Sequence, residues 1–504
     1  MRNPKLKLVC LLLLLASAQA SYASLKFRVH VPGLLPSSGS GIPEEPSTPA
    51  DIVVALSGSV LPAGTVGSPY GVSLSSLLSI TGVSSYDPAD VNWGISSSAL
   101  PPGLALVGDT ISGTPTAYTP ETSFAVTATY MTKPGTQSYT IMVNGMPLVV
   151  TQVTAGANHT CAITPTGGAK CWGANTYGQL GTGNTTTSLV PVDVFGLTSG
   201  VAQLSAGNRF TCAVTTAGAA KCWGYGGKVG DGTSSARWHP TTVSGLASGV
   251  SEIATGYSHA CAKTTAGGLK CWGRNSDNEL GDGTTTDRTA PVDVIGLTSG
   301  VSQVAVGGWT AGGYTCAVTS SGGAKCWGYN TNGNIGNGTT TTQPSPVNVT
   351  GLTSGVARIS TGATHTCAVT TSGGALCWGG NAQGRLGDGT TTSRSTPVSV
   401  VGLTSGVSQI SPALYHTCAV TTAGQTKCWG YNATNLLGDG TTVTQHTPHD
   451  VPGLTATTQV TTNEDRTCVV TTGGGAKCWG PNSVGQLGDG TTTTRLTPVS
   501  VITQ

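Results

Sequence analysis

The stretch Cys161-Ala-Ile-Thr-Pro-Thr-Gly-Gly-Ala-Lys-Cys171 decides the fold. Folded as a hairpin, it places Cys161 directly opposite Cys171, with Pro165-Thr166-Gly167 as the turn. The third position of a three-residue hairpin loop needs a left-handed backbone, which Gly167 adopts without strain. Directly opposite residues have Cα atoms about 4.5–5.5 Å apart, and that separation is compatible with a disulfide. The stretch therefore predicts a β-hairpin closed by a disulfide.

The same cysteine spacing occurs seven times. Apart from Cys10, all cysteines lie beyond residue 160, and nine residues separate the two members of each pair. An even, evenly spaced set in an exported chain indicates disulfides, whereas zinc sites favour pairs only two to four residues apart. We therefore predict seven disulfides and no metal site. The predicted pairs are Cys161–Cys171, Cys212–Cys222, Cys261–Cys271, Cys316–Cys326, Cys367–Cys377, Cys418–Cys428 and Cys468–Cys478.

The cysteine pairs mark a repeat of about 51 residues. Each unit contains four strand-like phrases bounded by Gly and Pro. They are an apolar run as in 201–207, a hairpin strand as in 211–215, a Lys-Cys-Trp-Gly phrase as in 221–224 and a Pro-Val-x-Val phrase as in 291–294. Four strands in each of seven units predict a seven-bladed β-propeller over residues 150–504. An open β-solenoid is the alternative, but its repeats are normally shorter.

The units resemble the regulator of chromosome condensation repeat family of seven-bladed propellers. The resemblance covers residues 151–504 and rests on phrases such as Gly156-Ala-Asn-His159-Thr-Cys-Ala-Ile163 and Cys171-Trp-Gly173-Ala-Asn175-Thr-Tyr-Gly178-Gln-Leu-Gly181, which recur in part at 362–365 and 479–488. The founding activity of that family is nucleotide exchange on a nuclear GTPase. Intracellular members of the family generally lack the cysteine pairs. Nucleotide exchange is therefore kept only as an alternative function for this chain.

The N-terminus has the layout of an export signal. Arg2, Lys5 and Lys7 precede a short apolar run, and Ala18-Gln19-Ala20 follows it as a small-x-small cleavage pattern. We predict a signal peptide over residues 1–20, with cleavage after residue 23 as a second choice. No later run approaches the roughly 18 apolar residues that a membrane span needs.

A small β domain is predicted between the signal peptide and the propeller. Residues 21–50 are rich in Pro, Ser and Gly and are expected to form a linker. Residues 51–146 contain no cysteine and alternate strand-like runs with turns, which predicts a β-sandwich. The stretches 100–106 and 111–116 resemble immunoglobulin-like domains of bacterial surface proteins, which are commonly spacers or adhesive modules.

Composition excludes several classes of protein. The 504 residues carry a formal net charge of +2, and 9% of them are charged, against roughly 25% in a typical domain. Nucleic-acid binding needs clustered Lys and Arg, which this chain lacks. The abundance of Gly, Thr and Ser disfavours helices. We therefore predict an all-β protein: a seven-bladed propeller preceded by a small immunoglobulin-like β-sandwich.

No set of residues suggests catalysis or a cofactor, because the titratable residues follow the repeat. Four histidines share one repeat position, where other blades carry Phe210, Tyr314 and Arg466. We interpret these histidines as structural. We interpret the Asp-Gly phrases as turns rather than calcium loops, and the repeated tryptophans as packing residues. The lysines beside the second cysteine are expected to be solvated. The residues are His159, His259, His365 and His416; Asp231, Asp282, Asp388, Asp439 and Asp489; Trp172, Trp223, Trp272, Trp327, Trp378, Trp429 and Trp479; and Lys170, Lys221, Lys270, Lys325, Lys427 and Lys477.

Binding residues are sought where the repeat is broken, since recurring positions serve stacking. Blade 4 has four extra residues before its first cysteine, blade 2 gains an Arg-Trp-His phrase, and blades 6 and 7 have altered turns. Trp, Tyr and Arg are favoured interface anchors. The binding candidates are Trp238, Trp309, Tyr314, Tyr415, Glu464, Asp465 and Arg466.

We therefore expect a secreted, periplasmic or surface-displayed binding protein that is not an enzyme, is monomeric, and recognises an extracellular protein or glycan. A hydrolase or lyase on a propeller face and a GTPase regulator are the alternatives.

Overall fold

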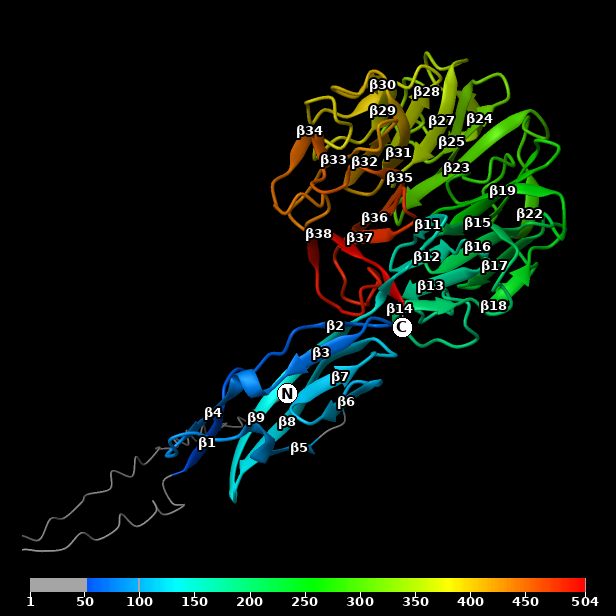
Figure 1. Cartoon of the computed structure of the whole chain (residues 1–504). Coiled ribbons are helices and arrows are strands. Elements are labelled where there is room, and N and C mark those ends of the chain that lie inside the picture. The colour runs from blue at the N-terminus through cyan, green and yellow to red at the C-terminus, as the bar shows by residue number, and fades with distance from the viewer. Residues whose placement is uncertain (1–51, 98–99, 504) are drawn as a thin grey trace, which may run out of the picture. The chain divides into compact units, whose positions relative to one another are not determined.

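The computed structural model describes residues 52–97 and 100–503, which are almost entirely β-strands and loops (Figure 1). The predicted signal peptide, Cys10 and the linker lie outside the described residues. The only helices in the described ranges are two single turns, Ser75–Leu77 and Pro88–Asp90. None of the described helices is long and apolar enough to cross a membrane.

Two sheets pack face to face in the first part of the chain. One contains β2 (Gly64–Thr65), β9 (Lys133–Asn144), β8 (Thr119–Tyr130) and β5 (Val91–Ser97), and the other contains β3 (Tyr70–Ser73), β7 (Thr110–Gly113) and β6 (Leu104–Val107), while β1 (Val53–Leu56) pairs with β4 (Leu78–Thr81). Phe124 and Tyr139 of the first sheet share a buried core with Leu104 and Ile111 of the second. This confirms the predicted β-sandwich; its immunoglobulin-like character stays a prediction.

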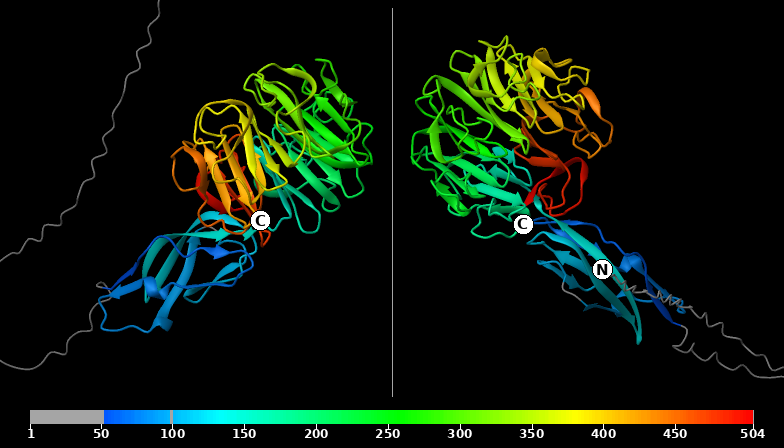
Figure 2. Two further views of the ribbon diagram at one scale, coloured as in Figure 1. Left: turned by 90° about the horizontal axis from the view of Figure 1, so that it is seen from above. Right: turned by 180° about the vertical axis from the view of Figure 1, so that it is seen from behind.

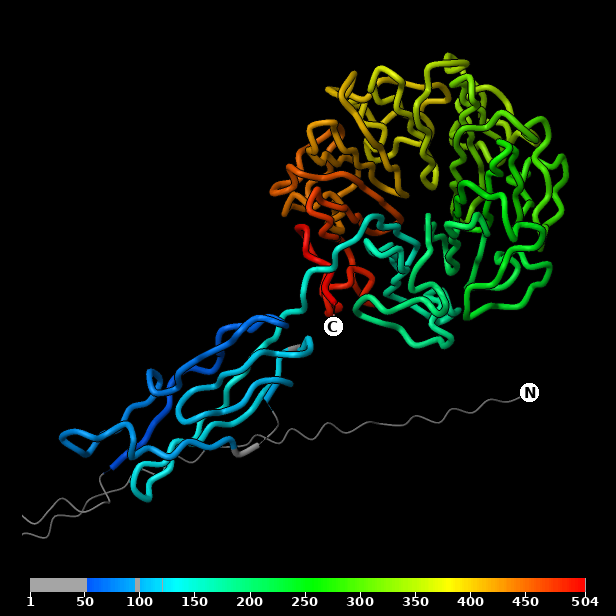
Figure 3. The backbone as a smooth tube through the Cα atoms, turned by 45° about the vertical axis from the view of Figure 1, so that its right-hand side comes forward, coloured from blue at the N-terminus to red at the C-terminus, as the bar shows by residue number. Residues whose placement is uncertain are grey.

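Beyond residue 150, consecutive strands form four-stranded antiparallel sheets, which are the predicted blades. The views in Figure 2 and Figure 3 show these sheets following one another around a central axis in sequence order. Within the described residues the blades number seven, which confirms the propeller. Blade 1 is β11 (Gln152–Ala155), β12 (His159–Ile163), β13 (Ala169–Gly173) and β14 (Ser188–Asp193); blade 2 is β15 (Val201–Ala206), β16 (Phe210–Thr215), β17 (Ala220–Gly224) and β18 (Arg237–Thr242); blade 3 is β19 (Val250–Thr255), β20 (His259–Thr264), β21 (Leu269–Gly273) and β22 (Arg288–Asp293); blade 4 is β23 (Val301–Trp309), β24 (Gly312–Thr319), β25 (Ala324–Gly328) and β26 (Gln343–Asn348); blade 5 is β27 (Val356–Thr361), β28 (His365–Thr370), β29 (Ala375–Gly379) and β30 (Arg394–Ser399); blade 6 is β31 (Val407–Pro412), β32 (His416–Thr421), β33 (Thr426–Gly430) and β34 (Gln445–Asp450); blade 7 is β35 (Thr457–Asn463), β36 (Arg466–Thr471), β37 (Ala476–Gly480) and β38 (Arg495–Ser500).

The stapled hairpin forms in the predicted register. Cys161 lies directly opposite Cys171 in the β12–β13 pair, and Gly167 has a φ of 77° at the third position of the turn. All seven predicted cysteine pairs are at bonding distance, with S–S separations of 2.07 to 2.12 Å. Each pair joins the second and third strands of one blade, so every blade has its own covalent link.

The repeated tryptophans join neighbouring blades. Each is buried, and its indole Nε1 donates a hydrogen bond of 2.9 to 3.1 Å to a backbone carbonyl of the preceding blade. Trp172 of blade 1 bonds to Gln486 of blade 7 in the same way, so the contact continues around the ring. This confirms the interpretation of these tryptophans as packing residues. The accepting carbonyls belong to Gln179, Lys228, Glu279, Asn334, Arg385, Leu436 and Gln486.

The ring closes without a blade that is shared between its two ends. In the described part of the chain, the four strands of every blade are consecutive in sequence. Instead, β10 (Met146–Pro147) pairs antiparallel with β39 (Ile502–Thr503), and Val149 forms a bridge with Gly475 of blade 7. The two ends of the propeller therefore meet in a short β-ribbon beside blade 7.

The Asp-Gly phrases form turns, as predicted. Asp282 illustrates the arrangement, because its Oδ1 accepts from the backbone N–H and the hydroxyl of Thr284. Its Oδ2 pairs with Arg288 at 2.9 Å. Protein donors thus satisfy both oxygens of this carboxylate within the turn.

Candidate binding face at the mouth of the channel

The inner strands of the blades enclose a central cavity of about 180 Å³. All seven blades contribute to its wall, mostly with small residues such as Ala155, Gly207, Gly256 and Ala413. The lining contains a single carboxylate among the described residues, that of Glu464. A lone carboxylate does not supply the paired acid and base that a glycoside hydrolase uses.

Around one mouth of this channel lies a face rich in tyrosine, which we call the mouth face. It is made by the turns between the first and second strands of each blade and by the loops after each Cys-Trp-Gly phrase. Both kinds of segment meet in contacts such as the backbone hydrogen bond from Tyr225 to Arg209. Six of the seven tyrosines beyond residue 150 lie in these segments, namely Tyr177, Tyr225, Tyr257, Tyr329, Tyr415 and Tyr431.

One aromatic cluster of the mouth face comes from blades 1 to 3. The rings of Tyr177 and Tyr225 meet edge to face at 5.2 Å, and the Arg209 guanidinium lies 4.9 Å from the Tyr177 ring. The Lys228 ammonium lies 5.3 Å from the Tyr225 ring and 5.6 Å from the Tyr257 ring. Burial is the main cause that lowers the pKa of Lys228 to about 8.

The second cluster depends on the long hairpin of blade 4. The four extra residues extend the β23–β24 pairing as far as Trp309, which lies opposite Gly312. The Trp309 ring meets the ring of Tyr415, in blade 6, edge to face at 6.4 Å. Because blade 5 separates these two blades in the sequence, the hairpin reaches across part of the mouth face. Tyr415 also packs against Tyr431, with the centres of the two rings 5.7 Å apart.

A cleft of about 510 Å³ adjoins this second cluster. It is lined by residues of blades 5, 6 and 7, and three of the predicted binding residues, Tyr415, Glu464 and Asp465, lie together in it. The complete lining is Gln383, Arg385, Tyr415, Tyr431, Thr434, Glu464, Asp465 and Pro481.

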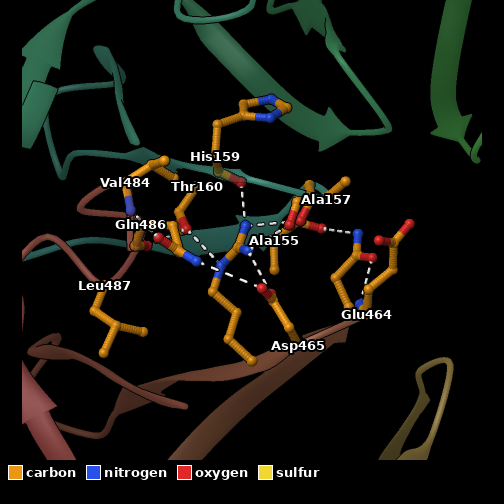
Figure 4. Close-up of polar contacts among 12 residues, drawn as sticks. Ala155, Ala157, His159, Thr160, Glu464, Asp465, Val484, Gln486 and Leu487 are labelled. Atoms are coloured by element: carbon orange, nitrogen blue, oxygen red, sulfur yellow. Dashed lines mark hydrogen bonds and ion pairs between the residues drawn. The ribbon is translucent and has the colours of Figure 1, made fainter. Parts of the chain in front are cut away.

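The carboxylates of the cleft are perturbed by burial. Burial and the neighbouring Asp465 raise the pKa of Glu464 to about 7, and burial raises the pKa of Asp465 although Arg466 opposes the shift. Asp465 Oδ1 accepts from Arg466 at 3.2 Å, whereas the Glu464 carboxylate has no partner among the described residues. Figure 4 shows Glu464 turned away from the hydrogen-bonded group around Asp465.

Two of the predicted binding residues are scaffold residues, which corrects the expectation for them. Tyr314 is fully buried and donates its hydroxyl to the carbonyl of His365 at 2.7 Å. Arg466 is also fully buried, and its guanidinium donates to blade 1 carbonyls, including that of Ala157 at 2.8 Å (Figure 4). Both side chains bond to the next blade around the ring, so neither is accessible to a ligand.

Trp238 is half-exposed, but the structure does not bring it to the cleft. It lies in β18, the outermost strand of blade 2, beside Gly178 of the blade 1 loop. A Cβ atom on Gly178 would come within 2.5 Å of the indole, which shows how closely the ring packs on that loop. The Trp238 ring thus packs on the blade 1 loop and does not line the cleft.

The four equivalent histidines join blades, as interpreted from their position. All are fully buried, and each Nε2 lies 2.7 to 2.8 Å from a threonine hydroxyl of the next blade. Thr211, for example, donates its own hydrogen to the Gln179 carbonyl and therefore accepts from His159 Nε2–H. Burial lowers the pKa of His159 to about 3, so the ring is neutral.

Sequence reasoning missed several residues of the mouth face. Tyr225, Tyr329 and Tyr431 share the position after the Trp-Gly phrase, where other blades carry Ala, Arg, Gly or Pro. These tyrosines could have been identified from the variation at this position within an otherwise regular repeat unit. Arg385 was missed because it stands in a recurrent Gly-x-Leu-Gly phrase, whose variable second residue differs in most blades.

Similarity to known proteins follows the repeat. Two sequence models of the regulator of chromosome condensation (RCC1) repeat match residues 150–179, 201–228, 250–279 and 356–385, and residues 170–214, 267–312, 322–369 and 372–420, respectively. The ultraviolet-B receptor UVR8 of Arabidopsis thaliana is 32% identical over 60% of this chain, and the human E3 ubiquitin-protein ligase HERC2 is 32% identical over 50% of it. The matches span only 58% and 4% of those two proteins.

Solved structures show the same fold. Human WBSCR16 superposes with a TM-score of 0.57 and 20% identity, covering 66% of this chain and 92% of its own. Yeast RCC1 (Prp20), solved with Kap60, superposes with a TM-score of 0.58 and 18% sequence identity, covering 71% of this chain and 85% of its own. The matched parts of residues 150–420 therefore carry repeats of the regulator of chromosome condensation (RCC1) family.

Proposed function

We propose that this chain is an exported, non-catalytic binding protein that recognises a protein partner through its mouth face. The observation that carries this proposal is the accumulation of tyrosine, Trp309 and arginine side chains on one face, since these residue types dominate the energetically important centres of protein interfaces. Relatives point to the same kind of role: yeast RCC1 was solved bound to Kap60, and a study of Prp20p concerns its binding to Gsp1p and histones.

The disulfides support the proposed export. Bonded cysteine pairs persist in oxidising compartments and are rare in the cytosol. We expect thiol titration of denatured protein recovered from the exported fraction to find no free thiol before reduction and fourteen after it, given the seven bonded pairs. Fourteen free thiols in protein isolated without reductant from the cytosol would reject export and favour an intracellular regulator.

A site-specific crosslinking experiment tests the binding face. A photoreactive phenylalanine analogue replaces Tyr431 in one sample of the full-length protein, and Phe195 in the other. Phe195 is 63% exposed and lies outside the segments that form the mouth face, so it is the matched control. The samples are irradiated with proteins extracted from the exported fraction and from cell surfaces.

We expect one protein to be captured through position 431 and not through position 195, and purified partner to bind Trp309→Ala at least tenfold more weakly than the parent. Equal capture at both positions, or affinity unchanged by Trp309→Ala, would reject the mouth face as the binding site. Capture of glycan alone would replace the protein partner with a carbohydrate ligand.

A further inference from the structure

Arg385 is a buried cation with an incomplete set of partners. Its side chain is 7% exposed, and its backbone is held in place because its carbonyl accepts from Trp429 and Thr417 of the next blade. Nη1 donates to the Leu414 carbonyl at 2.6 Å and to the Thr364 hydroxyl at 2.9 Å. Nε is buried without a hydrogen-bond partner, and within 52–97 and 100–503 no carboxylate forms an ion pair with the guanidinium.

Two other arginines of this face, Arg466 and Arg274, have the carboxylate partner that Arg385 lacks. Arg466, also buried, donates to four backbone or hydroxyl oxygens of blade 1 and pairs with Asp465. Arg274 pairs with Asp277 at 2.8 Å. A buried charge normally requires such a partner, because its removal from water is costly unless an opposite charge compensates. Arg385 lines the cleft of blades 5 to 7, so a ligand in that cleft is able to supply the missing charge.

The walls of the cleft select the shape of that ligand. The Arg385 guanidinium lies 6.0 Å from the Tyr415 ring centre, and Tyr431 contacts Tyr415 on the same wall. Two aromatic rings beside a guanidinium favour a short apolar stem that ends in a planar anion, since arginine binds carboxylates through paired N–H donors. Glu464 lines the same cleft but does not pair with Arg385.

We propose that this cleft receives an aspartate or glutamate side chain of the protein partner, whose carboxylate pairs with Arg385 beside Tyr415 and Tyr431. The proposal rests on the proposed function, because it names the group that the mouth face recognises. A protein side chain is chosen over a free carboxylate because the cleft is continuous through Tyr415 with Trp309, and such a surface suits a larger partner.

The test selects peptides from a random display library on the immobilised full-length protein. We expect enriched sequences with a fixed Asp or Glu next to an apolar or aromatic residue. A selected peptide is then synthesised with its acidic residue and with the matching amide. Binding of both peptides is measured to the parent, Arg385→Gln, Arg385→Lys, Tyr431→Ala and Trp309→Ala.

The acidic peptide should bind Arg385→Gln at least tenfold more weakly than the parent, whereas the amide peptide should bind both equally. That non-additivity isolates the charge pair from any loss of structure. Arg385→Lys keeps the charge but loses the paired donors, so we expect intermediate affinity. Binding of the acidic peptide should also weaken as salt is raised from 0.05 to 0.5 M (chosen to span about a threefold change in screening length).

Three results would overturn the inference in distinguishable ways. Peptides that depend on Trp309 and Tyr431 but show no preference for acidic residues, or that bind Arg385→Gln as well as the parent, would reject the carboxylate site and leave the proposed function intact. Peptides unaffected by Trp309→Ala and Tyr431→Ala would reject the mouth face itself. Enrichment of Lys or Arg would instead identify Glu464 as the anchor and also reject the inference.

Discussion

The four buried histidines show what a single residue position does in this fold. Each ring fills the interface between two blades and donates one N–H to the next blade, while its Nδ1 stays without a partner. Burial favours the neutral ring because the charged form would lose its hydration. The position accepts Phe210 in blade 2 for the same reason, since filling the interface matters more there than the hydrogen bond.

Acid should destabilise the protein through these histidines. Burial lowers the pKa of His416 to about 3, against 6.5 for the unfolded chain. The stabilisation is therefore fully present above pH 6.5 and is lost as the pH falls toward 3, by about 1.4 kcal/mol per pH unit for each histidine. We expect urea unfolding between pH 4 and 6 to show that the free energy of unfolding depends less steeply on pH in His416→Phe than in the parent. The difference should correspond to the uptake of about one proton fewer on unfolding. Exposed His449→Gln is the control, and an unchanged slope in His416→Phe would contradict the assignment.

At the scale of an element, the disulfide hairpin is the unit that lets each blade persist with few large side chains. Its two central strands carry the cysteines in direct opposition, and its turn is short. The covalent link restricts the unfolded chain, and it does so separately in every blade.

Removal of one disulfide should therefore lower the free energy of unfolding by a limited amount, because each bond constrains one blade. We expect Cys418→Ala with Cys428→Ala to lower the free energy of unfolding by about 2–3 kcal/mol, because the bond closes a short loop. Exposed Thr442→Ala in the same blade is the control and should change stability by less than about 0.5 kcal/mol. Denaturant titration under non-reducing conditions measures both variants, and equal stability would show that packing alone holds the blade.

The long hairpin of blade 4 has no counterpart in the other blades, and under the proposed function it contributes to partner binding. Deletion of residues 309–312 would return this hairpin to the length found in the other blades. We expect stability to change by less than about 1 kcal/mol, and affinity for the crosslinked partner to fall at least tenfold, or about 1.4 kcal/mol. Trp309→Phe keeps an aromatic ring and should bind more tightly than the deletion. A deletion that binds like the parent would remove the hairpin from the interface.

At the scale of the whole molecule, the ring depends on the contact between its last and first blades. Arg466 spans this junction, with acceptors more than 300 residues earlier in the sequence. Gln486 supports it by donating to Asp465 and by giving its carbonyl to Thr160 and Trp172. Figure 4 shows Gln486 beside Asp465 and Thr160 at this junction.

Arg466→Gln should open this junction. The carbonyls that it serves would lose their donor while buried, so we expect a loss of about 2–4 kcal/mol in the free energy of unfolding. Arg495→Gln is the control, because Arg495 forms a partly exposed ion pair with Asp489 and such pairs contribute about 0–1 kcal/mol. Thermal unfolding monitored by circular dichroism compares the two variants, and equal losses would contradict a special role for the junction.

The sequence by itself determined the blades, because their signals are local and repeated. Cysteines with nine residues between them and a glycine at the third turn position specify a hairpin with no reference to the rest of the chain. Seven copies then specify the propeller, and recurrence correctly identified the tryptophans and histidines as packing residues. Breaks in the pattern singled out Trp309 and Tyr415, whose rings the structure brings into contact, because side chains that serve stacking recur.

Only the tertiary structure decided which irregular residues face solvent and which close the ring. Tyr314 and Arg466 break the pattern as Trp309 does, yet they are buried between blades. The unpaired Nε of Arg385, and the cleft that this residue lines, likewise follow from groups contributed by blades 5 to 7. These contacts join residues about 50 to 300 positions apart, and burial and charge pairing depend on that assembled surface rather than on neighbours in the chain.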